Sequence, residues 1–343
     1  MTRDIAAFLA DDFERLGAVA PALLLDGRRL MLSGATGFFG KNLLALLAWL
    51  HRRGQRFEVV GLSRDPARFL AAQPWAAALP WLHLLEADVR DPWPGHGRFD
   101  AVVHAATDTH ASAHTDPQAV FDDGVAGTRQ ALAFAAAHGV QRLLLTGSGA
   151  QYGELPAGPV PETHAAACDP TQPGSAYGEA KRVGELLATL ASARGGFEVV
   201  PTRCFAFVGP GLDLHGHFAI GNFIRDALAG GPLRLSSDGS AVRSYLYGAD
   251  LAWWLLHLLF TSPPGQAINV GSDEGLSVAA LASLTRDMLR PDAAVRLGPA
   301  QPATPRQHYL PSIHRAGDLG LAVWTPLPLA IRRTGAWHGW QHV

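Results

Sequence analysis

Short apolar runs alternate with longer amphipathic segments between residues 29 and 205. The apolar runs lie in RRLMLSG, FEVVGLSR, LHLLEADV, FDAVVHAAT, QRLLLTGSG and FEVVPTRCFAF. Intervening segments such as AVFDDGVAGTRQALAFAAAHG repeat apolar residues at helical spacing. Strands that alternate with helices are typical of a doubly wound parallel sheet with helices on both faces. The pattern therefore predicts an α/β fold over residues 29–205.

The two ends of the chain follow other patterns. The first segment, MTRDIAAFLADDFERLG, mixes acidic and apolar residues at helical spacing, so residues 1–28 are predicted to form a helical extension. After residue 205 the elements shorten between Gly/Pro-rich turns such as VGPGLDLHGH, which predicts a smaller α/β substrate-binding lobe over residues 206–343. We expect this lobe to cover the carboxyl edge of the sheet, where ligands bind in such folds, and the chain to cross back to the sheet.

Composition excludes several classes of partner. The 343 residues carry a formal charge of −2 and no run of Lys or Arg, so we expect no nucleic acid partner. The most apolar window, LAWWLLHLLF, is half as long as the roughly 20 residues that a membrane-spanning helix needs, so we expect no membrane partner either. Cys168 and Cys204 lie outside any ligand spacing and the histidines are scattered, which predicts reduced thiols, a cytoplasmic location and no metal site.

A glycine turn follows the first predicted strand. In SGATGFFG, Gly34, Gly37 and Gly40 are spaced Gly-x-x-Gly-x-x-Gly and lead into an apolar helix pattern. Glycines allow a phosphate to approach the backbone, and the N-terminus of the following helix attracts the negative charge of a pyrophosphate. The turn therefore predicts a Rossmann-type dinucleotide site in residues 29–205.

The end of the second predicted strand bears on the choice of cofactor. An acidic residue there binds the ribose 2′-hydroxyl of NAD, whereas a basic residue accommodates the 2′-phosphate of NADP. The strand ends in Ser63 and Arg64, with no acid before Asp65. We therefore expect NADP(H), with NAD(H) as the alternative. Asp88 and Val89 are expected to meet the adenine, and Ala105 and Ala106 to lie under the dinucleotide.

Tyr177 and Lys181 are the first candidate catalytic pair. Lysine occurs only at positions 41 and 181, and Lys181 stands four residues after Tyr177, on the same face of a predicted helix. A nearby ammonium stabilises phenolate, so we expect the pKa of Tyr177 to fall and the phenol to exchange protons near neutral pH. Lysine can also bond ribose hydroxyls, for which the planar arginine fork is too bulky.

Ser148, in LLLTGSGAQYG, is the third candidate. At the end of a strand it could orient a substrate oxygen toward Tyr177, and Thr146 is the competing hydroxyl.

These motifs resemble the extended short-chain dehydrogenase/reductases, the nucleotide-sugar epimerase/dehydratase/reductase family, over about residues 29–335. The glycine turn and the Tyr-x-x-x-Lys pair match that family, and SGAQYG places Ser148 at the position of its catalytic Ser or Thr. The family's Arg-x-x-Asn-x-Tyr-Gly-Pro segment corresponds to RCFAFVGP, which begins at Arg203. The resemblance implies a homodimer formed through the helices near residues 117–138 and 177–192.

The resemblance also implies a set of site residues. The cofactor is expected at Gly34, Thr36, Gly37, Phe38, Phe39, Gly40, Ser63, Arg64, Asp88, Val89, Ala105, Ala106, Tyr177, Lys181 and Arg203. The nucleotide sugar is expected at Ser148, Gly149, Gln151, Asn222, Phe223 and Arg243, with the arginine on the diphosphate.

Two departures from the family bear on the reaction. Its dehydratases carry Asp-Glu directly after the catalytic residue, and its decarboxylases also use an acid there, whereas this chain has Gly149 and Ala150. Loss of water from the sugar needs acid/base groups that are missing at these positions. We therefore expect NADPH-dependent reduction of a nucleotide-linked 4-keto-6-deoxyhexose. The alternative is a 4-epimerase with tightly bound NAD; a dehydratase, a decarboxylase and a non-catalytic dinucleotide-binding regulator are less favoured.

Overall fold

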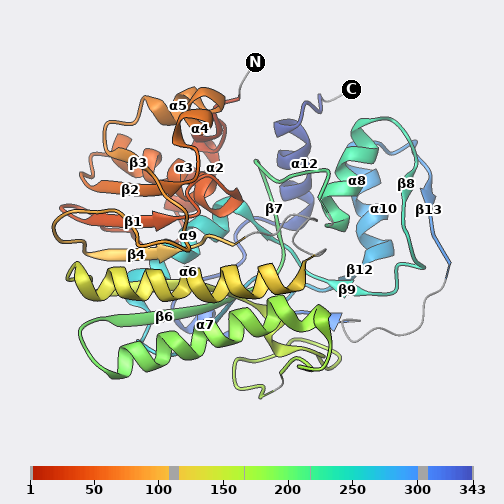
Figure 1. The fold of residues 1–343 in the computed structure, drawn as a ribbon. Helices are drawn as coiled ribbons and strands as arrows, with labels where there is room; N and C mark the ends of the chain where they lie inside the picture. Colours follow the sequence, from red (N-terminus) through yellow and green to blue (C-terminus); the bar gives the residue numbers. More distant parts are fainter. Residues whose placement is uncertain (1–2, 108–115, 166, 217, 300–307, 342–343) are drawn as a thin grey trace.

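A seven-stranded parallel sheet forms the centre of the computed structural model, which describes residues 3–107, 116–165, 167–216, 218–299 and 308–341 (Figure 1). The strand order is β11-β6-β5-β4-β1-β2-β3, and each neighbouring pair is parallel. The strands are β1 (Arg29–Ser33), β2 (Glu58–Ser63), β3 (Leu82–Glu86), β4 (Ala101–His104), β5 (Arg142–Ser148), β6 (Glu198–Cys204) and β11 (Ile268–Val270). The predicted doubly wound α/β fold is confirmed.

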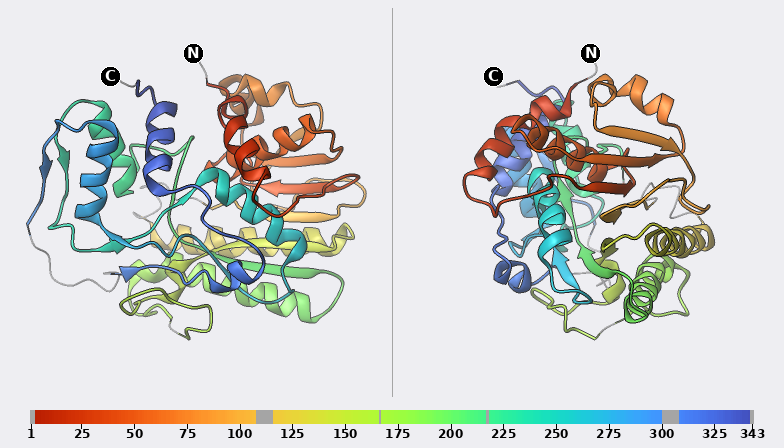
Figure 2. Two further views of the ribbon diagram at one scale, coloured as in Figure 1. Left: turned by 180° about the vertical axis from the view of Figure 1, so that it is seen from behind. Right: turned by 90° about the vertical axis from the view of Figure 1, so that its left-hand side faces the viewer.

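Helices cover both faces of this sheet, as Figure 2 shows. One face carries α3 (Phe38–Arg52) and α9 (Gly248–Thr261), and the other carries α6 (Pro117–Ala137) and α7 (Ala176–Ala193). Within β1, Leu30 and Leu32 belong to the apolar core on the first face, whereas Met31 belongs to the core on the second. A strand with apolar residues on both faces reads as a continuous apolar run, which explains the pattern in the sequence. The short helices α4 (Pro66–Ala72) and α5 (Pro74–Ala77) connect β2 to β3.

The chain after residue 206 begins a second group of elements, which lies beyond the strand ends in Figure 1, returns to the sheet through α9 and β11, and then adds the remaining elements of the group. Its helices are α8 (Ala219–Leu228), α10 (Val278–Leu289), α11 (His314–Asp318) and α12 (Leu327–Trp337). Its short strands pair as β7 (Phe207–Val208) with β10 (Leu246–Tyr247), β8 (Leu233–Arg234) with β13 (Val295–Arg296), and β9 (Val242–Arg243) with both β12 (Leu276–Ser277) and β14 (His308–Tyr309). Within the described residues, every helix falls short of the length and apolarity that crossing a membrane requires.

The N-terminal segment is part of the core. Its helices are α1 (Ile5–Phe8) and α2 (Ala10–Gly17), and the apolar side chains of Leu9, Phe13 and Leu16 are fully buried. The carboxylate of Asp12, which is also buried, accepts hydrogen bonds from Arg333 of α12 at 2.7 and 3.0 Å and from the hydroxyl of Tyr247 at 3.1 Å. The segment is thus linked to α12 by an ion pair whose carboxylate is buried and whose guanidinium is partly exposed.

Replacing Asp12 by alanine should leave the Arg333 guanidinium without its carboxylate. Breaking a buried ion pair by removing one partner costs about 3–5 kcal/mol. Because the Arg333 side chain is 25% exposed and can still reach water, we expect Asp12→Ala to lower the free energy of unfolding by about 3 kcal/mol, at the lower end of that range, measured by chemical denaturation. The neighbouring Asp11 is exposed, so Asp11→Ala should change it by less than about 0.5 kcal/mol. Equal stability of the two variants would contradict this account.

Candidate active site

The glycine turn joins β1 to α3 and lies against the end of β4. Gly34 has a φ of +74°, and a side chain there would come within 2.6 Å of the Ala105 backbone. A side chain at Gly40 would come within 2.2 Å of the carbonyl oxygen of Gly34. Gly37 precedes α3 and supplies no side-chain cap, so the first amides of that helix can face an anion. The residues therefore fit a dinucleotide pyrophosphate, which Gly34, Thr36, Gly37, Phe38, Phe39 and Gly40 would surround.

Two buried polar residues that the sequence analysis missed support this turn. Ser33 ends β1, His104 ends β4, and the two are paired in register. The Ser33 hydroxyl accepts a hydrogen bond from the amide of Ala106 at 3.3 Å, and its oxygen lies 2.7 Å from Nδ1 of His104. Burial lowers the pKa of His104 to about 3, so the imidazole is neutral. Its Nδ1 can then accept a hydrogen bond from the Ser33 hydroxyl. The signal in the sequence is the position of both residues at ends of adjacent strands.

The ends of β2 and β3 place the other predicted adenosine contacts. Ser63 is buried and Arg64 is exposed at the end of β2. The carboxylate of Asp65 caps α4 by accepting the amide of Arg68 at 2.8 Å. Asp88, just before Val89, pairs with Arg90 at 2.7 Å, and these hydrogen bonds lower the pKa of Asp88.

Tyr177 and Lys181 lie in the first turns of α7. The ammonium of Lys181 donates to the hydroxyl of Thr107 at 2.6 Å and to the carbonyl of Thr146 at 2.7 Å, and lies 6.0 Å from the centre of the Tyr177 ring. Burial lowers the pKa of Lys181 to about 8, although the neighbouring Cys204 opposes this shift. The Lys181 ammonium is therefore held near the end of β5 and beside Tyr177.

Ser148 ends β5 and caps the 3₁₀ helix η2 (Gly149–Tyr152). Its hydroxyl oxygen accepts the amide hydrogen of Ala150 at 3.1 Å. The competing hydroxyl, Thr146, donates to the carbonyl of His104 at 2.9 Å, inside the sheet. Helix α7 packs closely on η2, because a side chain at Gly178 would come within 2.7 Å of the carbonyl of Ala150. The structure therefore brings Ser148 and the Tyr177 helix to the same edge of the sheet.

Arg203 and Gln151 lie in a polar network below η2. The Arg203 guanidinium donates to both carboxylate oxygens of Glu185, at 2.7 and 3.1 Å, and to the hydroxyl of Tyr152 at 2.8 Å. Gln151 donates to the same Glu185 carboxylate and accepts the amide of Ser148 at 3.3 Å. The contacts of Arg203 with cofactor and of Gln151 with substrate stay predictions, since these side chains bond the protein. Glu185 and Tyr152 were not predicted.

Gly149 is packed against an aromatic ring. A side chain at this position would come within 2.8 Å of the ring of Phe205, which in turn packs on Tyr309 at 4.7 Å between ring centres. The space that a side chain at residue 149 would need is therefore already filled.

The predicted nucleotide contacts lie on separate elements. Asn222 and Phe223 of α8 line a hollow of about 320 Å³ that Ser236 and Ser237 also line. Arg243 lies on β9, outside the residues that line the hollow, and its guanidinium is 6.0 Å from the ring centre of Tyr309.

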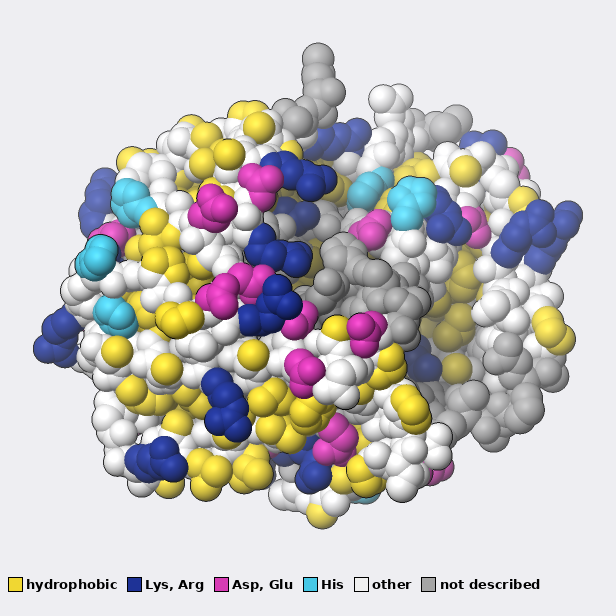
Figure 3. Space-filling view, viewed as in Figure 1, with side chains coloured by type: hydrophobic (Ala, Val, Ile, Leu, Met, Phe, Trp, Pro, Cys, Tyr) yellow, Lys and Arg dark blue, Asp and Glu magenta, His cyan; other side chains and the backbone are white. Residues whose placement is uncertain are grey.

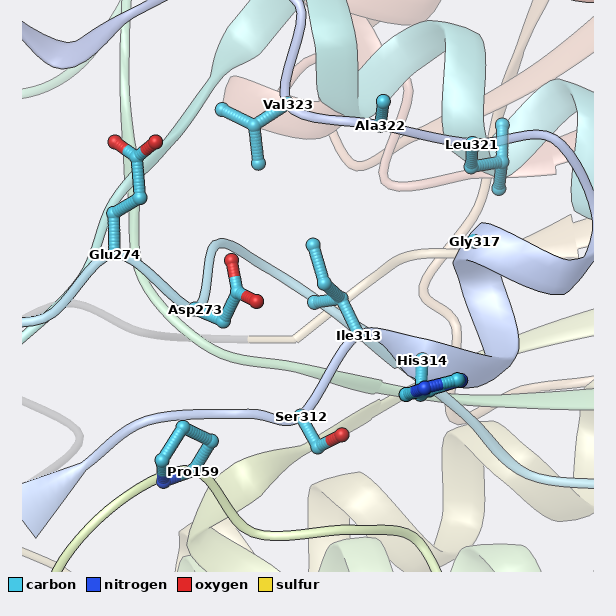
Figure 4. A pocket seen from close by; sticks show the side chains of 10 residues that line it. All are labelled: Pro159, Asp273, Glu274, Ser312, Ile313, His314, Gly317, Leu321, Ala322 and Val323. Atoms are coloured by element: carbon cyan, nitrogen blue, oxygen red, sulfur yellow. The ribbon is translucent and has the colours of Figure 1, made fainter.

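A second hollow, of about 430 Å³, lies between the loop after β11, α11 and the segment before α12 (Figure 4). Asp273 and Glu274 line one side, and Ser312 and His314 line another. None of its lining residues is a predicted site residue.

Curated proteins with similar sequences act on nucleotide sugars according to their names. The chain is 26% identical to UDP-glucuronic acid decarboxylase 6 of Arabidopsis thaliana over 298 residues, which cover 85% of this chain and 82% of that protein. It is 27% identical to a dTDP-4-dehydro-6-deoxy-D-allose reductase of a Streptomyces species, over 91% of this chain and 96% of that protein.

Solved structures share the fold. A UDP-glucose 4-epimerase of Thermotoga maritima, solved with UDP-glucose, has a TM-score of 0.78 at 20% identity and covers 90% of this chain and 98% of its own. A dTDP-glucose 4,6-dehydratase of Streptomyces venezuelae, solved with NAD, has a TM-score of 0.75 at 25% identity and covers 90% of this chain and 96% of its own.

A sequence model of the NAD-dependent epimerase/dehydratase family matches residues 30–271, from the first strand of the sheet to the end of the last. The match includes the glycine turn, Ser148 and the Tyr177–Lys181 pair. The resemblance inferred from the sequence is confirmed: the chain belongs to the NAD-dependent epimerase/dehydratase family.

Proposed function

We propose that the protein is an NADPH-dependent reductase of a nucleotide-linked 4-keto-6-deoxyhexose. The proposal rests on one observation. The hydroxyl of Ser148, the phenol of Tyr177 and the ammonium of Lys181 belong to a site with a glycine turn and with no carboxylate at residues 149 and 150. A similar reductase, the dTDP-4-dehydro-6-deoxy-D-allose reductase, is among the proteins that match most of the chain.

Each of the three side chains would have its own task. Ser148 would donate its hydroxyl hydrogen to the keto oxygen, and Tyr177 would supply the proton that this oxygen takes up. Lys181 would hold the ribose and stabilise the phenolate that Tyr177 becomes. Bound NADPH supplies a hydride to the keto carbon.

Gly149 and Ala150 argue against dehydration and decarboxylation. Neither residue carries an acid where the family's dehydratases have one, and the ring of Phe205 occupies the space that a side chain at residue 149 would need. The decarboxylases that match this chain are similar to it in overall sequence. The chain departs from the family pattern at Gly149 and Ala150, the two residues that follow Ser148.

A nucleotide-sugar 4-epimerase is the second candidate. It would use the same three side chains with tightly bound NAD, and it needs no additional carboxylate after Ser148. Purified protein that carries stoichiometric NAD and converts one sugar epimer into another without added cofactor would favour it.

The nucleotide would bind in the hollow beside α8. Asn222, Phe223, Ser236 and Ser237 offer an apolar surface and polar groups there, as small-molecule sites do. Arg243 would pair with the diphosphate.

The surface formed by α6 and α7 supports a homodimer. Leu186 and Leu190, four residues apart on α7, are 58% and 50% exposed. Figure 3 shows hydrophobic side chains among charged ones on the face where these helices lie. Burial of the two leucines against a second copy would remove this apolar surface from water.

The end of β2 supports NADP over NAD. Arg64 is exposed where a 2′-phosphate would lie, and Asp65 uses its carboxylate to cap α4. The NAD seen in related structures belongs to those proteins.

The reaction can be tested with NADPH and a panel of nucleotide-linked 4-keto-6-deoxyhexoses. We expect NADPH oxidation with at least one of them, followed by absorbance. Tyr177→Phe removes the proton donor and should lower kcat by a factor on the order of 10²–10⁴. If no sugar in the panel supports oxidation by the wild-type protein, the proposed reaction is wrong.

Arg64 should set the preference for NADPH. A charge-assisted hydrogen bond contributes about 1.5–3 kcal/mol, so Arg64→Ala should lower the preference for NADPH over NADH at least about tenfold. The ratio of kcat/KM values for the two cofactors measures this. Arg68 is exposed one turn further along α4, and Arg68→Ala should leave the ratio unchanged. Equal ratios in both variants would remove Arg64 from the site.

Cofactor affinity should fall between pH 7 and pH 9. The Lys181 ammonium loses its proton in this range because its pKa in the ligand-free protein is about 8, while His104 stays neutral and Cys204, with a pKa of about 11, stays protonated. Losing the charge should raise the Kd for NADPH about tenfold, measured by fluorescence titration. Lys181→Met should bind NADPH weakly with little change between the two pH values; an equal change in that variant would assign the effect to another group.

A further inference from the structure

The segment Ser148–Gln151 forms a capping box at the end of β5. The Ser148 hydroxyl accepts the amide of Ala150, and the side chain of Gln151 accepts the amide of Ser148. Such reciprocal bonds normally fix the beginning of a helix. Here the capping residue is also the hydroxyl proposed to act on the substrate.

The capping box sets the direction of the Ser148 hydroxyl. A serine hydroxyl has one hydrogen and two lone pairs. The bond from the Ala150 amide, at 3.1 Å, uses a lone pair and does not use the hydrogen. The hydroxyl is thereby fixed as an acceptor toward the protein and keeps its hydrogen for a substrate oxygen.

Gln151 is held in turn by Glu185. The amide nitrogen of Gln151 donates to Glu185, so its oxygen is turned toward the amide of Ser148. Gln151 is 3% exposed, which leaves it little freedom to turn over. Glu185 is itself fixed by two hydrogen bonds from Arg203.

Glu185 belongs to the helix that carries the other two groups. Tyr177, Lys181 and Glu185 are spaced by four residues on α7 and therefore share one face of the helix. The first two reach the site directly, and the third reaches Ser148 through Gln151. A shift of α7 would displace all three groups together.

We propose that Gln151 and Glu185 are positioning residues that hold the Ser148 hydroxyl in its donating direction. This inference rests on the proposed role of Ser148. It places Gln151 behind the serine and adds Glu185, for which no contact with substrate or cofactor is proposed. The pair controls the rate of the chemical step without touching the substrate.

Glu185→Gln and Gln151→Asn test the proposal. The first removes the negative charge of residue 185 and puts an NH2 group in place of one carboxylate oxygen, so the ion pair with Arg203 is lost and the side chain that holds Gln151 is no longer fixed. The second is one methylene shorter and leaves the Glu185–Arg203 ion pair intact, so it separates positioning from folding. We expect each variant to lower kcat about tenfold while the KM for NADPH stays unchanged.

An exchanged pair provides the rescue. In the double variant Gln151→Glu with Glu185→Gln, the amide of residue 185 can donate to residue 151, whose carboxylate still accepts the amide of Ser148. We expect kcat to return to within about threefold of the wild-type value. A double variant as slow as the single variants would contradict the coupling of residues 151 and 185 to Ser148.

Hydrogen exchange gives a second readout that needs no substrate. The amides of Ser148 and Ala150 should exchange at least about tenfold faster in Glu185→Gln and in Gln151→Asn than in the wild type. Glu198→Gln is the matched control. It removes the ion pair between Glu198 and Arg142, which begin β6 and β5, whereas Ser148 stands at the other end of β5. It should change neither kcat nor exchange.

The outcomes separate this proposal from the proposed function. Wild-type protein that reduces no keto sugar overturns the reductase, and the exchange rates still decide whether Gln151 and Glu185 hold the turn. Active wild type with unchanged kcat in both single variants, or unchanged exchange at Ser148 and Ala150, overturns the positioning role.

Discussion

The close contact between α7 and the turn after β5 is the constraint on which the site depends. Gly178 lets the first turn of the helix lie against the carbonyl of Ala150, where any side chain would collide. This contact sets the distance between the end of a strand, which carries Ser148, and a helix, which carries Tyr177 and Lys181. The parallel sheet contributes the rest, because all its strands end at the edge where the glycine turn lies.

Much of this arrangement could be predicted because its signals are local in the sequence. The strands of the sheet are short apolar runs, the glycine turn follows the first of them, and the tyrosine and lysine are one helical turn apart. Each of these patterns needs only a few consecutive residues. The alternation of strands and helices then determines which strand ends meet.

The parts of the site that the sequence analysis did not predict depend on residues that lie far apart in the chain. Ser33 and His104 are separated by 71 residues, and Gln151 and Glu185 by 34, so neither pair forms a local pattern. The contact of Arg203 with the cofactor stays a prediction from its place in a family segment, and the ion pair of its guanidinium with Glu185 was not predicted. The Ser-x-x-Gln spacing of the capping box was visible in the sequence, yet only the fold reveals that the capping serine lies at the end of a central strand. The ring of Phe205 likewise reaches Gly149 only through the pairing of β5 and β6.

The ion pair between Asp12 and Arg333 joins residues 321 positions apart. A ribosome makes the N-terminal helices early, but their ionic partner follows 321 residues later. Before then the apolar face of α2 can already pack on α3, where the ring of Phe13 contacts that of Trp49, but the Asp12 carboxylate lacks the guanidinium of α12. The core around α2 can therefore be completed only after α12 has been made, and the N-terminal helices stay partly uncovered during the synthesis of everything between them.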